Sequence, residues 1–261
     1  MPARLQAALE AQVAAGAPGA LARIEAPRAG LTWGGSAGYL AQGNSRALRP
    51  DDAFRAASVT KSVTAAVAVR LAHQGRLALD EPLAGQLAPE LLERWRALDA
   101  LPRTTPRQLL AHTAGLPNYF TDPAFAARLR ENPGRAWRPA ELVDHAATYG
   151  TPRFPPGEGF EYCDTGYVVT GILVEHAAGQ PLHEVYRELV LGPAGMDTTW
   201  LEGLRACPAA RSRPPLHRRA RLDDDLSDDR LGRRRPRHQC ARPGPLRAWT
   251  VVGTDHRLSR A

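Results

Sequence analysis

A single predicted helix does most to limit the folds open to this chain of 261 residues. Residues 57–75, ASVTKSVTAAVAVRLAHQG, are apolar at helical spacing, and Gly75 is the kind of residue expected just after a helix ends. Alanine and valine occur nearly all round this helix, which is typical of a buried helix rather than a surface one. The fold is therefore expected to pack other elements on every side of it.

Two strands are predicted ahead of that helix. Residues 3–15 predict a short amphipathic helix, and GALARIEA (19–26) and LTWGGSAGYL (31–40) predict strands around a turn at 27–30. An isolated two-stranded hairpin is only marginally stable in water, so these strands need partners in a sheet. No later segment supplies a convincing strand.

The rest of the first 200 residues is helical in pattern. Residues 76–160 are rich in proline and predict a helical insertion, residues 162–179 run from a loop into a second apolar helix, and residues 180–193 predict a third. The order of elements predicts an α+β fold, with an antiparallel sheet flanked by helices and a separate helical subdomain.

Composition excludes several classes of protein. The chain is 43% apolar, which is enough for a core. It contains no uninterrupted run of eighteen apolar residues, so no membrane-spanning helix is predicted. The N-terminus lacks the apolar region of a secretory signal, which favours a cytoplasmic location. Three scattered cysteines, Cys163, Cys207 and Cys240, are too few for a disulfide framework or a zinc cluster. We therefore expect no metal and no cofactor.

The net charge of +7 is concentrated in one part of the chain. Residues 205–261 hold 15 arginines and 6 aspartates, whereas residues 1–204 are slightly acidic. A basic segment can neutralise phosphates, so a nucleic-acid binder is a remote alternative. The acidic run at 223–229 and the lack of interleaved aromatic residues argue against it, and we expect no nucleic-acid partner.

The chain contains one lysine, Lys61, among 34 basic residues. Ser58 lies three residues earlier, so a helix places both side chains on one face, within hydrogen-bonding reach. Burial and the dipole of the helix N-terminus both disfavour an ammonium, so a buried Lys61 is expected to have a lowered pKa and to take the proton of Ser58. The residues alone leave open a capping serine followed by a solvated lysine.

Further blocks stand in order along the chain. They are LAHQGRLALDEPL (71–83), TPRQLLAHTAGLP (105–117), FPPGEGFEYCDTGYVVTGILVEHAAGQPL (154–182) and LGPAGMDTTW (191–200). Together with ASVTKSVTA around Ser58, they resemble the serine β-lactamase, penicillin-binding protein and D-peptidase superfamily. The resemblance is strongest to its class C-like and D-stereospecific peptidase or esterase branch, and covers roughly residues 5–203.

The resemblance implies a β-lactamase/transpeptidase-like fold and a serine hydrolase that acts on D-peptides, esters or β-lactams without a cofactor. It implies that Ser58 is the nucleophile, Lys61 its base, and Tyr162 the residue that passes a proton to the leaving group. Tyr162 could instead be a half-buried aromatic at a loop–helix junction. Asp164 stands where the family most often has asparagine, and it is expected to contact the substrate, in particular a ligand with an ammonium group.

Two nearby residues are expected to be structural. His112 lies in a block that resembles a loop packed beside the site, so we do not expect it to act in catalysis. Cys163 occupies a position that is commonly serine in the family, and we interpret it as a small packed residue rather than a nucleophile.

The resemblance fails after Trp200. The family pattern has a third motif there, His or Lys followed by Thr-Gly or Ser-Gly, on a strand that also supplies an oxyanion donor, and this chain has none. GC-rich codons for residues 233–247, read one nucleotide later, permit Gly-Gly-Gly-Leu-Val-Thr-Ser-Ala-Arg-Asp-Leu-Ala-Arg-Phe, which resembles the strand and helix expected at this point. A change of reading frame between about residues 202 and 226 is thereby indicated.

This interpretation divides the chain into a hydrolase domain at 1–203, which lacks its C-terminal sheet strands, and an Arg/Pro-rich tail at 204–261. The tail is expected to be extended and poorly packed, to add no strand to the sheet of residues 19–40, and to be cut first by proteases among residues 211–237. Hydrolysis by this chain is expected to be negligible. The alternative function is therefore that of a catalytically inactive, truncated relative.

Overall fold

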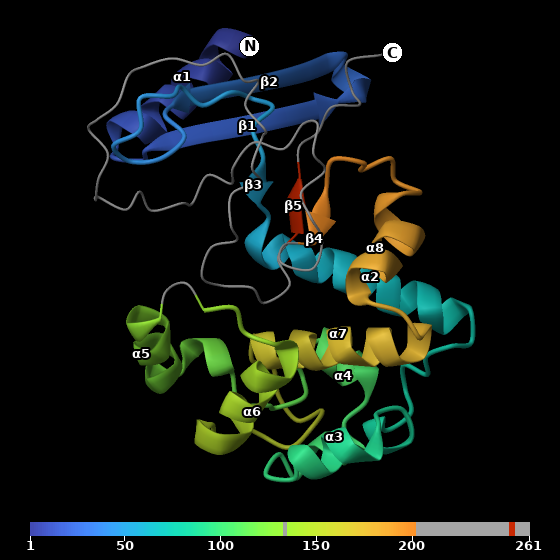
Figure 1. Ribbon diagram of the computed structural model, residues 1–261. Helices are drawn as coiled ribbons and strands as arrows, with labels where there is room; N and C mark the ends of the chain where they lie inside the picture. Colours follow the sequence, from blue (N-terminus) through green and yellow to red (C-terminus); the bar gives the residue numbers. More distant parts are fainter. Residues whose placement is uncertain (133–134, 202–250, 254–261) are drawn as a thin grey trace, which may run out of the picture. The chain divides into compact units, whose positions relative to one another are not determined.

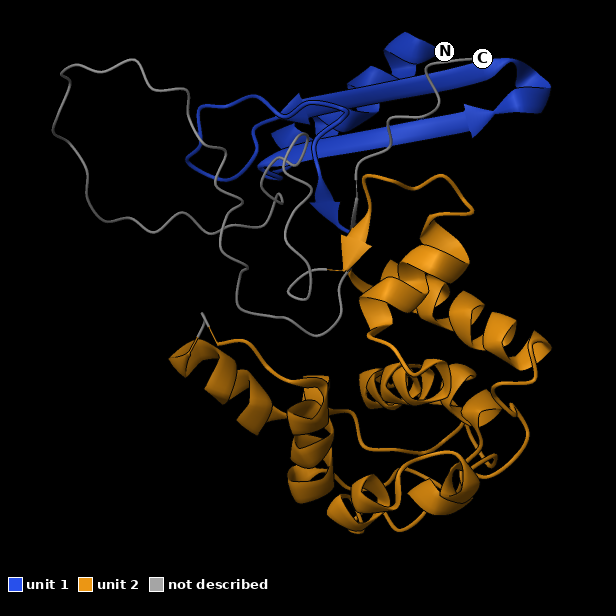
Figure 2. Ribbon diagram, turned by 45° about the vertical axis from the view of Figure 1, so that its right-hand side comes forward, with its two compact units in different colours: residues 1–55, 206–242, 252–261 blue, residues 56–205, 243–251 orange. Residues whose placement is uncertain are grey.

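A computed structural model describes residues 1–132, 135–201 and 251–253 (Figure 1). The described residues divide into two compact units, which Figure 2 shows in different colours. The first contains residues 1–55 with 252–253, and the second contains residues 56–201 with 251.

A β-hairpin covered by one helix makes up most of the first unit. Helix α1 (Pro2–Ala14) packs against β1 (Gly19–Ala26) and β2 (Leu31–Gly38), which pair antiparallel from Gly19↔Gly38 to Ala26↔Leu31. Gly30 ends the short 3₁₀ turn between the strands with a φ of 60°, a conformation that glycine adopts without the steric cost other residues meet. The predicted strands are confirmed.

Of the predicted tail at 204–261, the structure describes only residues 251–253. Strand β5 (Val251–Gly253) pairs antiparallel with β3 (Phe54–Arg55), through Phe54↔Gly253 and Arg55↔Val252. In the described part of the chain, the sheet formed by β1 and β2 has two strands. The expectations for residues 202–250 and 254–261, including the missing third motif, lie outside the described residues.

Helices dominate the second unit. They are α2 (Thr60–His73), α3 (Pro89–Arg94), α4 (Pro106–Leu110), α5 (Pro123–Glu131), α6 (Pro139–Tyr149), α7 (Asp164–Ala178) and α8 (Leu182–Tyr186), and strand β4 (Trp200–Leu201) ends the described run. Where a single helix was predicted over 180–193, α8 passes into a π-helical turn at Arg187–Leu191. The described residues between 76 and 160 hold short helices and no strand.

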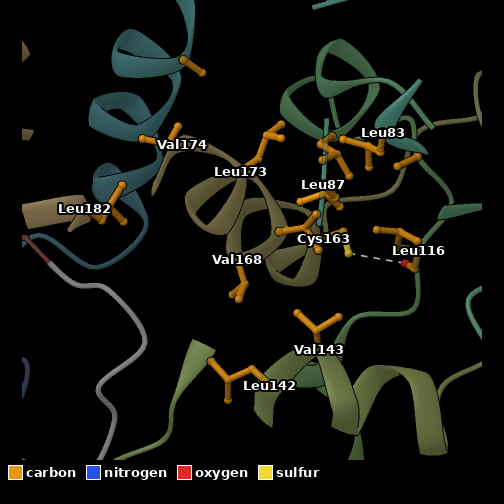
Figure 3. Packing of buried hydrophobic residues seen from close by; sticks show 14 of the residues in the cluster. Leu83, Leu87, Leu116, Leu142, Val143, Cys163, Val168, Leu173, Val174 and Leu182 are labelled. Atoms are coloured by element: carbon orange, nitrogen blue, oxygen red, sulfur yellow. Dashed lines mark hydrogen bonds between the residues drawn. The ribbon is translucent and has the colours of Figure 1, made fainter. Parts of the chain in front are cut away.

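Helix α7 lies at the centre of this unit and packs against α2, α4, α6 and α8 (Figure 1). Its apolar side chains Val168, Leu173 and Val174 join a core that includes Leu142 and Val143 of α6 (Figure 3). Burial of this cluster gives the unit its main stabilisation, since each large side chain removed from water contributes about 1.5–3 kcal/mol.

The expectation that α2 is buried all round is wrong. Its buried residues, among them Val67 and Leu71, lie along one face, whereas Val69 is 41% exposed and Arg70 is also exposed. The sequence of α2 is apolar nearly all round because its outward-facing positions include alanines, which are small enough to be exposed at little cost. Gly75 follows its end with a φ of 68°, as expected for the residue after a helix.

Candidate active site

Ser58 lies in a 3₁₀ turn, Ala57–Val59, directly before α2. The side chain of Ser58 is exposed, and Lys61, in the first turn of α2, donates a hydrogen bond from Nζ to Ser58 Oγ at 3.3 Å. Ala57 has a φ of 45°, in the left-handed region that residues with a Cβ seldom adopt. The predicted contact between Ser58 and Lys61 is thus present, at the end of a strained turn.

Asp164, the first residue of α7, forms an ion pair with Lys61. The Nζ of Lys61 lies 2.5 Å from Asp164 Oδ1, and the two side chains are only 16% and 19% exposed. Asn118 donates from Nδ2 to the other oxygen, Oδ2, at 3.3 Å, and the backbone N–H of Asp164 donates to Asn118 Oδ1 at the same distance. In this structure, the carboxylate therefore faces a lysine and an amide of the chain itself.

The electrostatics of Lys61 correct the expectation that it has a lowered pKa. Burial does act to lower the pKa of Lys61, but hydrogen bonds to Asp164 and Tyr162, together with the charges of those groups, outweigh it. The pKa of Lys61 is raised above its ordinary value of 10.5, so at neutral pH the side chain is an ammonium.

Tyr162 lies beside the same ammonium. The Nζ of Lys61 is 4.8 Å from the centre of the Tyr162 ring, and this side chain is 44% exposed. Asn118 donates from Nδ2 to the carbonyl of Tyr162 at 3.4 Å and so ties the loop before α7 to the loop after α4. The four residues singled out from the sequence, Ser58, Lys61, Tyr162 and Asp164, meet around one amine.

His112 supports the loop that carries Tyr162. It has a φ of 59°, its Nδ1 accepts a hydrogen bond from the backbone N–H of Cys163 at 3.1 Å, and its carbonyl accepts one from Glu161. The His112 ring stacks at 4.5 Å on the ring of Tyr162. Burial, and then the charge of Lys61, lower the pKa of His112, so its ring is neutral at neutral pH. These contacts agree with the structural interpretation of this residue.

Cys163 is packed in the core. Its side chain is 6% exposed, and Sγ donates to the carbonyl of Leu116 at 3.4 Å (Figure 3). Burial raises the pKa of the Cys163 thiol, which disfavours the reactive thiolate. The interpretation of Cys163 as a packed residue is confirmed.

Two residues of the site were missed in the sequence. Asn118 follows the block TPRQLLAHTAGLP directly, and its position just after a recognised loop was an available signal. Tyr167 lies three residues after Asp164 on the same face of α7; its ring centre is 5.7 Å from Lys61 Nζ, and its hydroxyl donates to the carbonyl of Leu110 at 3.0 Å. Aromatic residues at helical spacing are common in cores, so the sequence did not distinguish this tyrosine.

Two observations limit other kinds of site in the described part of the chain. No group of three or more His, Cys, Asp or Glu side chains there is placed to hold a metal ion. None of the described helices is long and apolar enough to cross a membrane.

Comparison with known proteins gives consistent matches. A sequence model of the beta-lactamase family matches residues 5–239. The D-stereospecific amidohydrolase from Streptomyces sp. superposes with a TM-score of 0.70 at 30% identity, covering 97% of this chain and 69% of that one. D-amino acid amidase from Ochrobactrum anthropi SV3 superposes with a TM-score of 0.64 at 28% identity, covering 81% and 55%.

A curated relative, Esterase EstB of Burkholderia gladioli, is 37% identical over 155 residues, which are 58% of this chain and 39% of the esterase. The chain spans less than half the length of the first curated relatives that it matches. The likeness to the solved structures confirms the predicted α+β, β-lactamase/transpeptidase-like fold. Because the family model covers most of the chain, this chain belongs to the beta-lactamase family.

Proposed function

We propose that this chain carries the machinery of a serine hydrolase that acts through a Ser58 acyl-enzyme on D-peptides, short esters or β-lactams. The observation that carries the proposal is the 3.3 Å contact between Ser58 Oγ and Lys61 Nζ, with Tyr162 beside the same amine. The substrate classes follow relatives whose names are an esterase, a D-aminopeptidase and penicillin-binding proteins. Asp164 was expected to contact the substrate, and its carboxylate would do so beside Lys61.

The proposed reaction has two stages, acylation of Ser58 and hydrolysis of the acyl-enzyme. Ser58 Oγ attacks the carbonyl carbon of the substrate, forms a C–O bond, and gives its proton to Lys61 when that side chain is a neutral amine. Tyr162 then passes the proton held by Lys61 on to the leaving nitrogen or oxygen as the bond of that atom to the carbonyl carbon breaks, so both residues return to their starting states. Water attacks the resulting ester, which releases the acid and restores the Ser58 hydroxyl.

The experiment is covalent labelling of the chain with a fluorescent penicillin and with a fluorophosphonate. Acylation, unlike complete turnover, needs only the first half of the reaction, so labelling is expected at Ser58 even though hydrolysis by this chain is expected to be negligible. The labelling is expected to be lost in Ser58→Ala. The matched control is Ser62→Ala, because Ser62 is an exposed serine of α2, four residues after Ser58, and its loss should not affect labelling. Equal labelling of the Ser58→Ala variant would place the nucleophile elsewhere, and no labelling of the parent chain would favour the inactive relative.

We also propose that the hydrolase domain ends near residue 203 and that the residues from 204 onward are read out of frame. The support is the absence of the third motif from the sequence after Trp200. The family match continues to residue 239, beyond the proposed end of the domain. The nucleotide sequence of the gene is therefore the test. Sequencing codons 200–240 should find one nucleotide gained or lost, and an unchanged frame would contradict the proposal.

A further inference from the structure

We propose that Asp164 is a positioning residue that holds Lys61 as an ammonium through their ion pair, so that Ser58 can be acylated efficiently only at alkaline pH. The ion pair itself stands on geometry, whereas its consequence for Ser58 rests on the proposed function. Asp164 would thus act through Lys61 and set the pH range of the reaction.

The contact has the geometry of a strong, directed ion pair. The Nζ–Oδ1 distance of 2.5 Å is short for an ammonium and a carboxylate, and both side chains are mostly shielded from water. Asn118 donates from Nδ2 to the second carboxylate oxygen, Oδ2, which restrains the side chain of Asp164. An opposite charge at this range stabilises the protonated lysine and so raises its pKa by about 1–3 units.

The other groups around the amine do not replace Asp164. Among the described residues, the titratable groups that face Lys61 are Tyr162, Tyr167, His112 and Asp164. Burial raises the pKa of Tyr167 and lowers that of His112, so both are neutral near pH 7. Asp164 is the carboxylate among them, and it is the group that forms the ion pair with Lys61.

The chemical consequence has a definite sign. Lys61 can accept the Ser58 proton only in its neutral form, and Asp164 stabilises the protonated form. An asparagine at 164 would have nearly the same shape but no charge, so the neutral amine would become populated at lower pH. In Asp164→Asn, acylation of Ser58 should therefore begin at a lower pH, even though the substitution removes the ion pair with Lys61.

The sole lysine of the chain permits a direct measurement. A protein labelled with ¹³Cε-lysine gives a single side-chain signal, that of Lys61, whose shift follows its own protonation between pH 7 and 12. In the parent chain, the midpoint is expected above 10.5, the ordinary value. In Asp164→Asn, it is expected at least about one unit lower. Circular dichroism at each pH identifies the range in which the protein is folded.

The control variant is Asp80→Asn. Asp80 forms a two-pronged ion pair with Arg107, is mostly exposed, and has no described contact with Lys61. Its replacement removes one carboxylate from the same unit and should leave the Lys61 midpoint unchanged. A midpoint below 10.5 in the folded parent chain would overturn the proposal even if Asp164→Asn failed to fold. Equal midpoints in the parent and Asp164→Asn would overturn it as well.

The second measurement is the rate of fluorophosphonate labelling between pH 6 and 10. The parent rate is expected to rise about tenfold per pH unit, and Asp164→Asn is expected to react about tenfold faster or more at pH 7. Labelling at pH 7 that is no faster in Asp164→Asn would overturn the effect on Ser58. If neither protein is labelled, the function proposed for Ser58 fails, while the lysine titration still decides the ion pair.

Discussion

The Nδ1 atom of His112 accepts a hydrogen bond from the backbone N–H of Cys163, 51 residues further along the chain. The bond links the loop after α4 to the loop before α7, and these two loops place Asn118 and Tyr162 around Lys61. It requires a ring whose Nδ1 is unprotonated, so it ties the geometry of the site to the protonation state of one histidine.

The first prediction is that the protein loses stability below about pH 6.5. Because burial and Lys61 lower the pKa of His112, the folded state binds a proton there less readily than the unfolded state. The stabilisation is therefore complete above the ordinary value of 6.5 and is lost as the pH falls through the folded pKa. Burial lowers the pKa of His145 as well, so it adds to the same trend.

His112→Asn isolates the part that belongs to His112. Asparagine tolerates the left-handed backbone, and its Oδ1 can accept the same hydrogen bond without titrating. Urea unfolding at pH 7 and pH 5 should show a smaller drop in the free energy of unfolding for the variant than for the parent. An equal drop in both proteins would show that His112 does not couple to pH.

The second prediction concerns Lys61→Arg. Arginine keeps the positive charge and the ion pair with Asp164 but does not deprotonate near physiological pH. The variant should fold with a Tm close to that of the parent and lose fluorophosphonate labelling by orders of magnitude. The control is Arg70→Lys, an exposed substitution on the same helix, which should label like the parent. Labelling of Lys61→Arg within a few-fold of the parent would show that Lys61 is not the base.

The third prediction tests Tyr162 with two reagents that have different leaving groups. In Tyr162→Phe, acylation by a penicillin should slow by about 10²-fold or more. The β-lactam nitrogen of the penicillin needs a proton as its bond to the carbonyl carbon breaks, and phenylalanine cannot supply one. Fluorophosphonate labelling should slow much less, because fluoride leaves without one. Tyr39→Phe, at an exposed tyrosine of the first unit, should change neither rate. Equal slowing with both reagents would make Tyr162 a structural residue.

Local pattern predicted the elements of this chain better than the contacts between them. Strand 19–26 follows from its own residues, and the pairing of Ser58 with Lys61 follows from i,i+3 spacing. The partner that sets the charge of Lys61 is 103 residues away, so no local pattern contains it. The same limit explains the error on the Lys61 pKa, because burial is visible in the sequence of a helix and an ion pair across the core is not.

The π-helical turn at 187–191 was also beyond local pattern. Residues 180–193 have helical spacing throughout, but Tyr186 is fully buried and its hydroxyl meets that of Thr64 on α2. The position of this tyrosine depends on a helix more than a hundred residues earlier. A change of helical pitch next to such a contact depends on tertiary packing, which the spacing of apolar residues does not describe.

The last prediction tests the turn that presents Ser58. Ala57 has a φ of 45°, which costs an alanine about 1–2 kcal/mol relative to glycine, and the residue is exposed, so a glycine loses no packing. Glycine has a larger conformational entropy when unfolded, which costs about 0.5–1 kcal/mol. Ala57→Gly should therefore match the parent or exceed it by up to about 1.5 kcal/mol in the free energy of unfolding.

Ala57→Val provides the opposite test at the same position. Valine has a branched Cβ that fits the left-handed region poorly, so it should lower the free energy of unfolding by about 1–2 kcal/mol. Urea unfolding of the three proteins measures the order directly. If glycine is the least stable of the three, the turn before Ser58 is not held in the left-handed conformation.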